Sequence, residues 1–300
     1  MKTTASTTTT ASTATTATTP APRRPADAAP AARPEARVPW SASCVADATG
    51  ALAFVVALPE GLTGGHLLLR QRGGGEEVLL PFTATGHGPL RAVLPGDTPL
   101  AEGHWEVHAQ APGGEPVRLR PGLDDLRALV DRDPEGADAV AVHLPYTSKY
   151  GNLSLRTWLR APHAEAGAVH VEPGETTVRG RCYGIVPTPA AYAELRPAEG
   201  EGEPVRAQVT GEGPDFRLRI AHAPLLAHGP RQWQVRLRPE GEGGPDIRLA
   251  RLLDDLVDRH AVFTYPATVH EGLRARPYYS GANNLAFRVT AVAPAADPAG

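Results

Sequence analysis

Cysteine, lysine and aromatic residues are all scarce in this chain of 300 residues. The two cysteines, Cys44 and Cys182, are too few for a zinc site, and they fall at non-equivalent positions of the internal repeat described below. We therefore expect free thiols, which fit a reducing cytoplasm. Lysine occurs only at positions 2 and 149, basic residues form no long run, and the formal net charge is −3. This balance argues against nucleic acid as a partner.

Long apolar runs are missing as well. The longest, residues 51–58, is far too short to cross a bilayer, and the N-terminal residues are Thr and Ser where a signal peptide has an apolar core. We expect no membrane span and a cytoplasmic location. The sequence also lacks a nucleophile elbow and a phosphate-binding glycine loop, so it predicts no catalytic residues and no cofactor.

Glycine and proline, in contrast, number 31 each, and 41% of the residues are hydrophobic. This composition is typical of many short strands joined by turns, with enough apolar surface to form cores. Residues 1–38 differ from the rest, because eleven of the first twenty residues are Thr and the remainder is rich in Ala and Pro. We expect this leader and the tail at residues 293–300 to be disordered.

An internal repeat organises the rest of the chain. Each copy contains a Trp in a polar–apolar alternation, then a Leu-Asp-Asp segment, then a Pro-Tyr turn followed by Asn-Leu-x-x-Arg. The offset between copies drifts only from 126 to 132 residues. The matched landmarks are Leu69 with Leu195, Trp105 with Trp233, Leu119 with Leu249, Asp124 with Asp254, Pro145 with Pro277, and Asn152 with Asn284.

The pattern predicts an all-β fold. Polar and apolar residues alternate in segments such as 104–108 and 216–220, and glycine-rich segments between such runs predict hairpin turns. We expect two tandem immunoglobulin-like antiparallel β-sandwich domains, at residues 39–162 and 163–292. Each copy also contains one short segment with apolar residues at helical spacing: Leu123, Leu126 and Val130 in the first copy, and Leu253, Leu256 and Val257 in the second.

Two acidic pairs lie in these helical segments, Asp124-Asp125 and Asp254-Asp255. Adjacent residues on a helix do not face each other, so neither pair can flank a substrate alone. Carboxylates in a first helical turn stabilise the helix dipole and accept hydrogen bonds from free N–H groups. Helix capping is therefore our interpretation, with acid–base chemistry as the alternative.

The repeated Pro-Tyr turn and the strand after it supply the ligand-binding candidates. Aromatic rings, amides and guanidinium groups together suit a sugar or an anionic polymer. The alternative is a structural turn, held by Tyr, that leads into the last strand. The candidates are Tyr146, Tyr150, Asn152 and Arg156 in the first copy, and Tyr278, Tyr279, Asn284 and Arg288 in the second.

Two further patterns suggest chemistry. His104, Glu106 and His108 alternate along one strand and would project from one face, which is a possible metal site; a solvated polar face is the alternative. Residues 131–133 read Asp-Arg-Asp, a form that nucleotide-sugar glycosyltransferases use to hold a metal, but strands at hairpin spacing precede it instead of a parallel nucleotide-binding sheet.

With its Leu-Asp-Asp segments and its Asn-Leu-x-x-Arg endings, the chain resembles a group of actinobacterial tandem β-domain proteins commonly labelled "transferase". The resemblance covers about residues 39–292 and includes His163-Ala164-Glu165. Similar modules accompany glycosyltransferases and CDP-glycerol glycerophosphotransferases. The resemblance implies an accessory role in the assembly of a glycan or cell-surface polymer, with a glycan or a glycosyltransferase-type protein as partner.

We therefore expect a non-catalytic binding protein. Two alternatives stay open: a transferase of the glycosyl- or glycerophospho-transfer type with a site between the two domains, and a structural module that contacts other proteins through edge strands.

Overall fold

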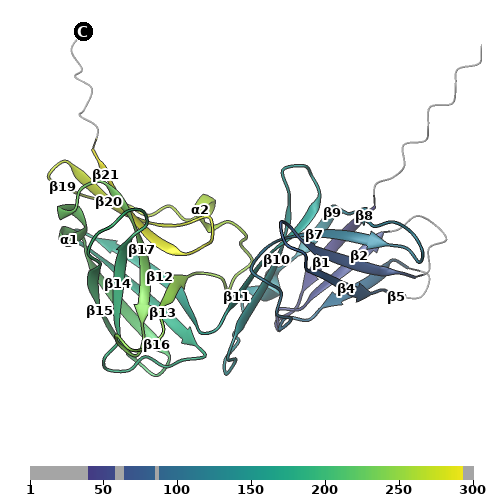
Figure 1. Ribbon diagram of the computed structural model, residues 1–300, viewed down its shortest axis with the longest axis horizontal. Coiled ribbons are helices and arrows are strands. Elements are labelled where there is room, and N and C mark those ends of the chain that lie inside the picture. The colour runs from purple at the N-terminus through teal and green to yellow at the C-terminus, as the bar shows by residue number, and fades with distance from the viewer. Residues whose placement is uncertain (1–39, 58–63, 85–87, 293–300) are drawn as a thin grey trace, which may run out of the picture. The chain divides into compact units, whose positions relative to one another are not determined.

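The computed structural model describes residues 40–57, 64–84 and 88–292. The predicted disordered leader and tail lie outside these residues, and the described part belongs to one compact unit. Strands dominate it, with three short helical segments, so the expectation of an all-β protein is confirmed (Figure 1). Within the described residues, no helix is long and apolar enough to span a membrane.

The first repeat consists of two sheets. A five-stranded sheet has the order β5-β6-β2-β1-β9, with bounds Thr83–Ala84, Leu90–Leu94, Leu52–Ala57, Ser41–Ala46 and Arg120–Asp125. A six-stranded sheet has the order β10-β11-β7-β3-β4, with β8 paired to β7; the bounds are Val140–Thr147, Leu153–Arg160, Gly103–Gln110, His66–Gln71, Glu77–Pro81 and Val117–Arg118.

The second repeat forms one ten-stranded sheet with the order β14-β15-β16-β13-β12-β18-β17-β21-β20-β19. The bounds are Tyr192–Pro197, Val205–Glu212, Asp215–Ala221, Glu175–Tyr183, His163–Glu172, Ile247–Ala250, Arg231–Arg238, Leu285–Ala291, Leu273–Tyr279 and Thr268–His270. An additional pairing of β14 with β17 closes the strands from β14 to β17 into a seven-stranded barrel.

The prediction of two antiparallel sandwiches is therefore wrong in two respects. The second repeat is a closed barrel, and β1–β9 and β12–β18 are parallel pairs. The barrel closes because β15 pairs with both β14 and β16, and β18 with both β17 and β12. In the first repeat the corresponding strands are each split in two, β4 from β5 and β8 from β9. Pro81 is the last residue of β4, next to the first of these breaks, and proline lacks the N–H that a continuous ladder needs.

Strand register nonetheless corresponds between the repeats. Trp105 of β7 lies opposite Leu155 of β11, as Trp233 of β17 lies opposite Phe287 of β21. Likewise Leu69 pairs with Val107 and Leu195 with Val235. The landmarks matched in the sequence thus occupy equivalent positions in the two sheets, while the boundary between domains near residue 162 stays a prediction.

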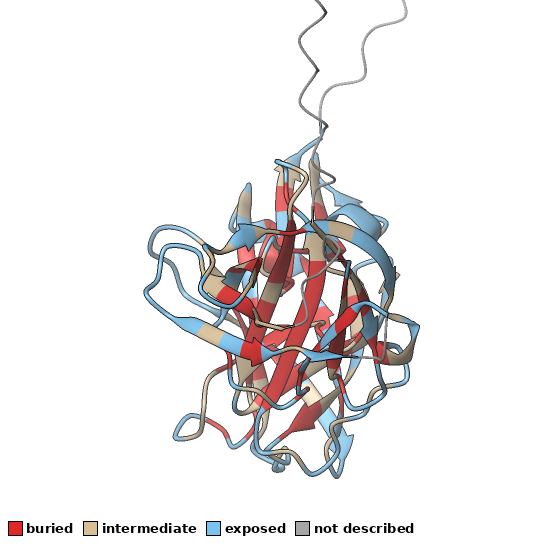
Figure 2. Cartoon of the chain, turned by 90° about the vertical axis from the view of Figure 1, so that its right-hand side faces the viewer, coloured by how far each residue is buried: buried red, intermediate tan, exposed pale blue. Residues whose placement is uncertain are grey.

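Each repeat has its own core, and buried residues lie along the strands (Figure 2). The aligned tryptophans Trp105 and Trp233 are fully buried in these cores. Cys44 and Cys182 are buried, free thiols. Tyr183, Ala250 and Leu252 of the second repeat are exceptions to this division, because they belong to the core cluster of the first.

The predicted helical segments are mostly not helical. Leu123 and both aspartates of the first copy lie on strand β9, and only a short 3₁₀ segment, η1 (Arg127–Leu129), follows. In the second copy residues 253–255 and 257 form bends, and the helix α2 (Arg259–Val262) begins after them. A further helix, α1 (His222–Ala227), has no counterpart among our predictions. Hydrogen-bonded pairing with β1 outweighs the helical spacing of the leucines, because the context of the sheet overrides local preference.

Candidate functional site

Three neighbouring strands of the first repeat, β10, β11 and β7, bring an imidazole, a phenol and a guanidinium group together on their surface. His104 Nδ1 and the hydroxyl of Tyr146 are hydrogen-bonded at 2.8 Å, and the two rings meet edge to face. Arg156 lies directly opposite His104 in the β11–β7 ladder, and its guanidinium group lies 4.9 Å from the centre of the buried Trp158 ring. We name His104, Tyr146 and Arg156 patch one.

The second repeat carries an equivalent group on β20, β21 and β17. The hydroxyl of Tyr278 donates to Gln232 Oε1 at 2.5 Å, and the guanidinium group of Arg288 lies 4.6 Å from the centre of the Tyr278 ring. Arg288 lies directly opposite Gln232 in the β17–β21 ladder, just as Arg156 lies opposite His104. We name Gln232, Tyr278 and Arg288 patch two.

The two patches share one chemistry. Each has a tyrosine hydroxyl that is hydrogen-bonded to a polar side chain from β7 or β17, and an arginine stacked on an aromatic ring. The pKa of His104 is lowered by partial burial and by the positive charges of Arg156 and Arg72, so the imidazole is neutral near pH 7. A neutral imidazole and the carboxamide of Gln232 can each donate and accept hydrogen bonds, which explains how they fill the same position.

The other four predicted ligand residues do not join the patches. Tyr150 is 72% exposed at the turn between β10 and β11. Asn152 and Asn284 hold the two turns through their backbones, each donating its N–H to a serine hydroxyl, Ser148 or Ser280.

Tyr279 is a correction to the predicted site. Its side chain is fully buried and packs against Phe263 and Tyr265, so it belongs to the core of the second repeat rather than to a surface. Successive residues of a strand point to opposite faces, so Tyr278 and Tyr279 could not both be exposed. Ser154 of β11 is likewise fully buried, and it accepts a hydrogen bond from Arg118.

The metal site predicted at His104, Glu106 and His108 finds no support. Glu106 faces Arg118 and Arg72, at 3.8 and 4.0 Å, and His104 is engaged with Tyr146. Among the residues that the structure describes, no group of three or more His, Cys, Asp or Glu side chains is arranged to hold a metal ion.

The Asp-Arg-Asp segment is equally structural in its contacts. Arg132 donates to the carbonyl oxygens of Ala141 and Gly96, which fastens the loop to its neighbours.

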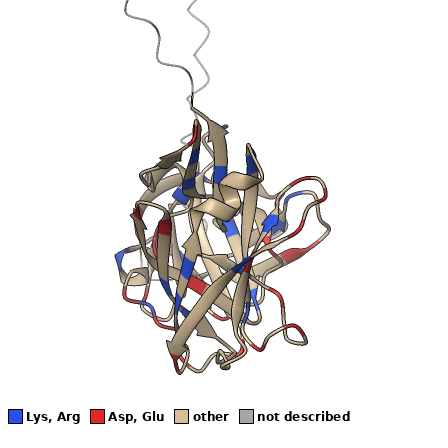
Figure 3. Ribbon diagram, turned by 90° about the vertical axis from the view of Figure 1, so that its left-hand side faces the viewer, with Lys and Arg blue, Asp and Glu red and all other residues tan. Residues whose placement is uncertain are grey.

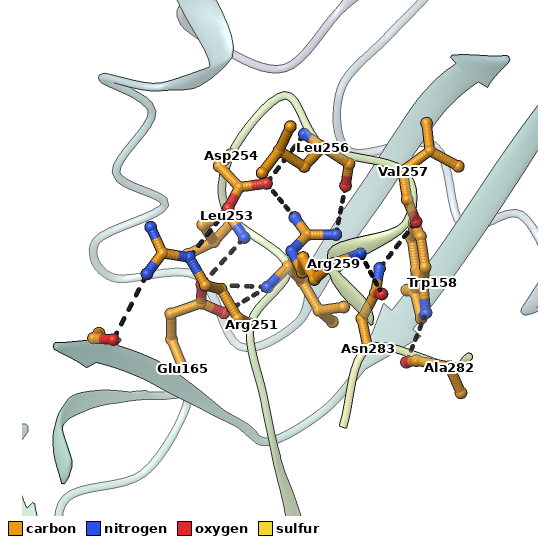
Figure 4. Close-up of polar contacts among 12 residues, drawn as sticks. Trp158, Glu165, Arg251, Leu253, Asp254, Leu256, Val257, Arg259, Ala282 and Asn283 are labelled. Carbon is orange, nitrogen blue, oxygen red and sulfur yellow. Dashed lines mark hydrogen bonds and ion pairs between the residues drawn. The ribbon is translucent and has the colours of Figure 1, made fainter. Parts of the chain in front are cut away.

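A second polar cluster, in the second repeat, surrounds the Leu-Asp-Asp segment (Figure 4). The carboxylate of Glu165 accepts hydrogen bonds from the backbone N–H groups of Leu252 and Leu253, at 2.9–3.1 Å, and contacts His163 Nε2 at 2.7 Å. In the first repeat the hydroxyl of Ser43 accepts from the N–H of Leu123 in the same way. Glu165 on β12 and Ser43 on β1 therefore each fix the Leu-Asp-Asp segment to the first strand of their repeat.

Asp254 is the centre of the same cluster. It accepts hydrogen bonds from Arg251, from the N–H of Leu256 and from Arg259, whose side chain is fully buried (Figure 4). Asn283 accepts from the N–H of Arg259 and donates to the carbonyl of Val257. Asp254 does not cap a helix: it neutralises a buried guanidinium group and closes a turn.

Sequence reasoning placed four of the six patch residues and missed the roles of His104 and Gln232. The signal was available, because both residues directly precede the matched tryptophans and are 128 positions apart. Their different chemistry concealed the correspondence, and only the paired strands show that both lie beside a Tyr.

No family model matches the chain, and no curated protein sequence matches it. Among solved structures, it is similar to a pullulanase from Anoxybacillus sp. LM18-11 in complex with maltotriose, with 11% identity and a TM-score of 0.22, over 66% of this chain and 24% of that one. It is also similar to the FN1–FN3 domains of chicken CNTN1 (11% identity, TM-score 0.19, 70% and 60%) and to a tetra-tandem repeat of a large adhesion protein (12%, 0.20, 84% and 63%). The chain thus spans about a quarter of the pullulanase.

Proposed function

We propose that this chain is a non-catalytic binding protein, an accessory module for the assembly of a glycan or cell-surface polymer, which holds its ligand on patches one and two. The observation that carries the proposal is the recurrence of the same three-residue surface group in both repeats. The core of each sheet needs the buried residues of these strands, but it does not need a partly exposed Tyr beside an Arg at the same register twice.

The chemistry of the patches favours a polyhydroxylated ligand with negative charge. A tyrosine ring offers an apolar face for a sugar ring, and its hydroxyl group offers a hydrogen bond. The guanidinium group of Arg156 or Arg288 supplies charge-assisted hydrogen bonds to a phosphate or carboxylate. A polymer that alternates sugar or polyol units with phosphates combines both features.

We propose further that the first repeat is immunoglobulin-like, that the chain is cytoplasmic, and that its partner is a glycosyltransferase-type protein. The two buried free thiols support a reducing compartment.

Calorimetric titration tests the proposal, with poly(glycerol phosphate) and a neutral dextran as probes. We expect the wild-type chain to bind the charged polymer, with affinity reduced about ten-fold by Arg156→Ala or Arg288→Ala and further by the double variant. Arg91→Ala is the matched control, because Arg91 is an exposed strand arginine outside both patches, and it should bind as the wild type does.

Tyr146→Phe and Tyr278→Phe separate the hydroxyl group from the ring. Both variants keep the apolar face, so we expect a smaller loss than for the arginine variants. Absence of heat with either polymer, or equal affinity of the double arginine variant and the wild type, contradicts the proposal.

A further inference from the structure

A row of hydrogen-bond donors crosses the outer face of the barrel in the second repeat. Arg179 of β13 lies directly opposite Arg217 of β16, which lies directly opposite Thr210 of β15. All three side chains are exposed, and they occupy directly paired positions of three adjacent strands, so they project from the same face. They line an open hollow of about 680 Å³.

Like charges directly opposite each other on antiparallel strands destabilise a sheet, because their Cβ atoms lie only about 5 Å apart. The arginines on either side of the row are neutralised: Arg219 pairs with Glu175 at 3.0 Å and Arg181 with Asp215 at 3.2 Å. Within the described part of the chain, Arg179 and Arg217 have no ion-pair partner. Figure 3 shows basic residues on the strands of the second repeat.

The carboxylates near the row do not pair with Arg179 or Arg217. Asp215 is taken by Arg181, and Glu212, which also lines the hollow, lies opposite Asp215 in the next row. The centre of the hollow therefore presents two guanidinium groups and a hydroxyl group with no acceptor bound to them.

The first repeat shows that the fold does not require arginine here. Its corresponding strands are β2 and β6, where the one arginine of the pair, Arg91, lies directly opposite Val55 and not opposite another arginine. Both strand pairs form without two facing arginines in the first repeat, so the facing arginines are a property of the second repeat.

We infer that the outer face of β13, β16 and β15 is a binding site for a phosphate group, held by Arg179 and Arg217 and by the hydroxyl of Thr210. A phosphate has three acceptor oxygens and a charge that removes the repulsion between the two guanidinium groups. This site is separate from patches one and two, and the inference does not depend on the proposed function.

The test is calorimetric titration of the full chain with inorganic pyrophosphate, at constant ionic strength and pH. We expect binding that weakens about ten-fold in Arg179→Gln or Arg217→Gln and is lost in the double variant. Arg179→Lys with Arg217→Lys should bind with intermediate affinity, because lysine keeps the charge and loses the bidentate geometry. Circular dichroism verifies that each variant is folded.

Two controls locate the site and the source of the phosphate. Arg91→Gln and the double variant Arg156→Ala/Arg288→Ala should bind pyrophosphate as the wild type does. A second arm of the titration uses poly(glycerol phosphate) and distinguishes free phosphate from phosphate carried by a polymer. The site favours the probe that the wild type binds more tightly and that Arg179→Gln/Arg217→Gln no longer binds. Equal binding of both probes by this double variant and the wild type, no binding of either probe, or loss of pyrophosphate binding in Arg156→Ala/Arg288→Ala instead overturns the inference.

Discussion

Asp254 and Asp255 are neighbours of identical chemistry, yet the structure gives them different roles. Asp254 is 7% exposed and contacts Arg259, which is fully buried, whereas Asp255 is partly exposed and has no ion pair among the described residues. A buried ion pair contributes little net stability, but the loss of one partner leaves a charge uncompensated in a medium of low polarity. Stability should therefore be sensitive to substitution of Asp254 in the Asp254–Arg259 ion pair.

Asp254→Asn should lower the free energy of unfolding by about 3–5 kcal/mol, because it leaves the guanidinium group of Arg259 without its carboxylate. Asp255→Asn is the matched control and should change it by less than about 0.5 kcal/mol. Urea denaturation followed by tryptophan fluorescence measures both. Equal effects of the two variants would show that Asp254 does not stabilise the buried charge.

The turn between the last two strands shows how one element is built twice from different residues. Gly151 in the first repeat and Asn283 in the second both have positive φ, 72° and 60°, and both donate their N–H to the carbonyl of a serine. Glycine adopts this conformation without steric strain, and asparagine tolerates it better than other residues. Asn283 adds two side-chain hydrogen bonds to the neighbouring α2 segment.

Substitutions at Asn283 should separate these two contributions. Asn283→Gly keeps the backbone conformation and loses the side-chain bonds, so we expect a loss of about 1–2 kcal/mol in the free energy of unfolding. Asn283→Ala loses the bonds and strains the backbone, which adds about 1 kcal/mol. Chemical denaturation of both variants and the wild type measures the order. A glycine variant less stable than the alanine variant would contradict it.

Elements also mark the limit of sequence reasoning. Alternation of polar and apolar residues predicted strands correctly at β7 and β16. The helical spacing of Leu123, Leu126 and Val130 was misleading, because Leu123 lies on the edge strand β9 and is 85% exposed. Spacing records the periodicity of side chains and contains nothing about the neighbouring strand, whose hydrogen bonds stabilise β9.

At the scale of the whole molecule, buried histidines make stability depend on pH. Burial lowers the pKa of His143 to about 4, and its Nε2 atom contacts the carbonyl of Thr98 at 3.0 Å. Burial, with the charges of Arg118 and Arg70, lowers the pKa of His108 to about 4. Both rings are neutral in the folded chain near pH 7 and would ionise near pH 6.5 in the unfolded chain.

The unfolded state therefore binds more protons between pH 6.5 and pH 4, and stability falls as the pH is lowered through this window. For His143 alone, the free energy of unfolding should drop by about 2 kcal/mol between pH 7.5 and pH 5. His143→Gln should reduce this pH dependence by that amount, whereas His270→Gln, at an exposed site, should not change it. Urea denaturation at the two pH values measures the difference, and an unchanged slope in His143→Gln contradicts the argument.

The sequence by itself determined the β class, the duplication and the aligned core positions, because burial on a strand requires apolar residues at every second position and a repeat displays that requirement twice. Only the tertiary structure decided that the second repeat closes into a barrel, that Tyr279 lies in the core while Tyr278 is part of a surface, and that His104 and Gln232 occupy the same position. These outcomes depend on which strands pair and in which register. Such contacts join residues far apart in the chain, and no local pattern records them.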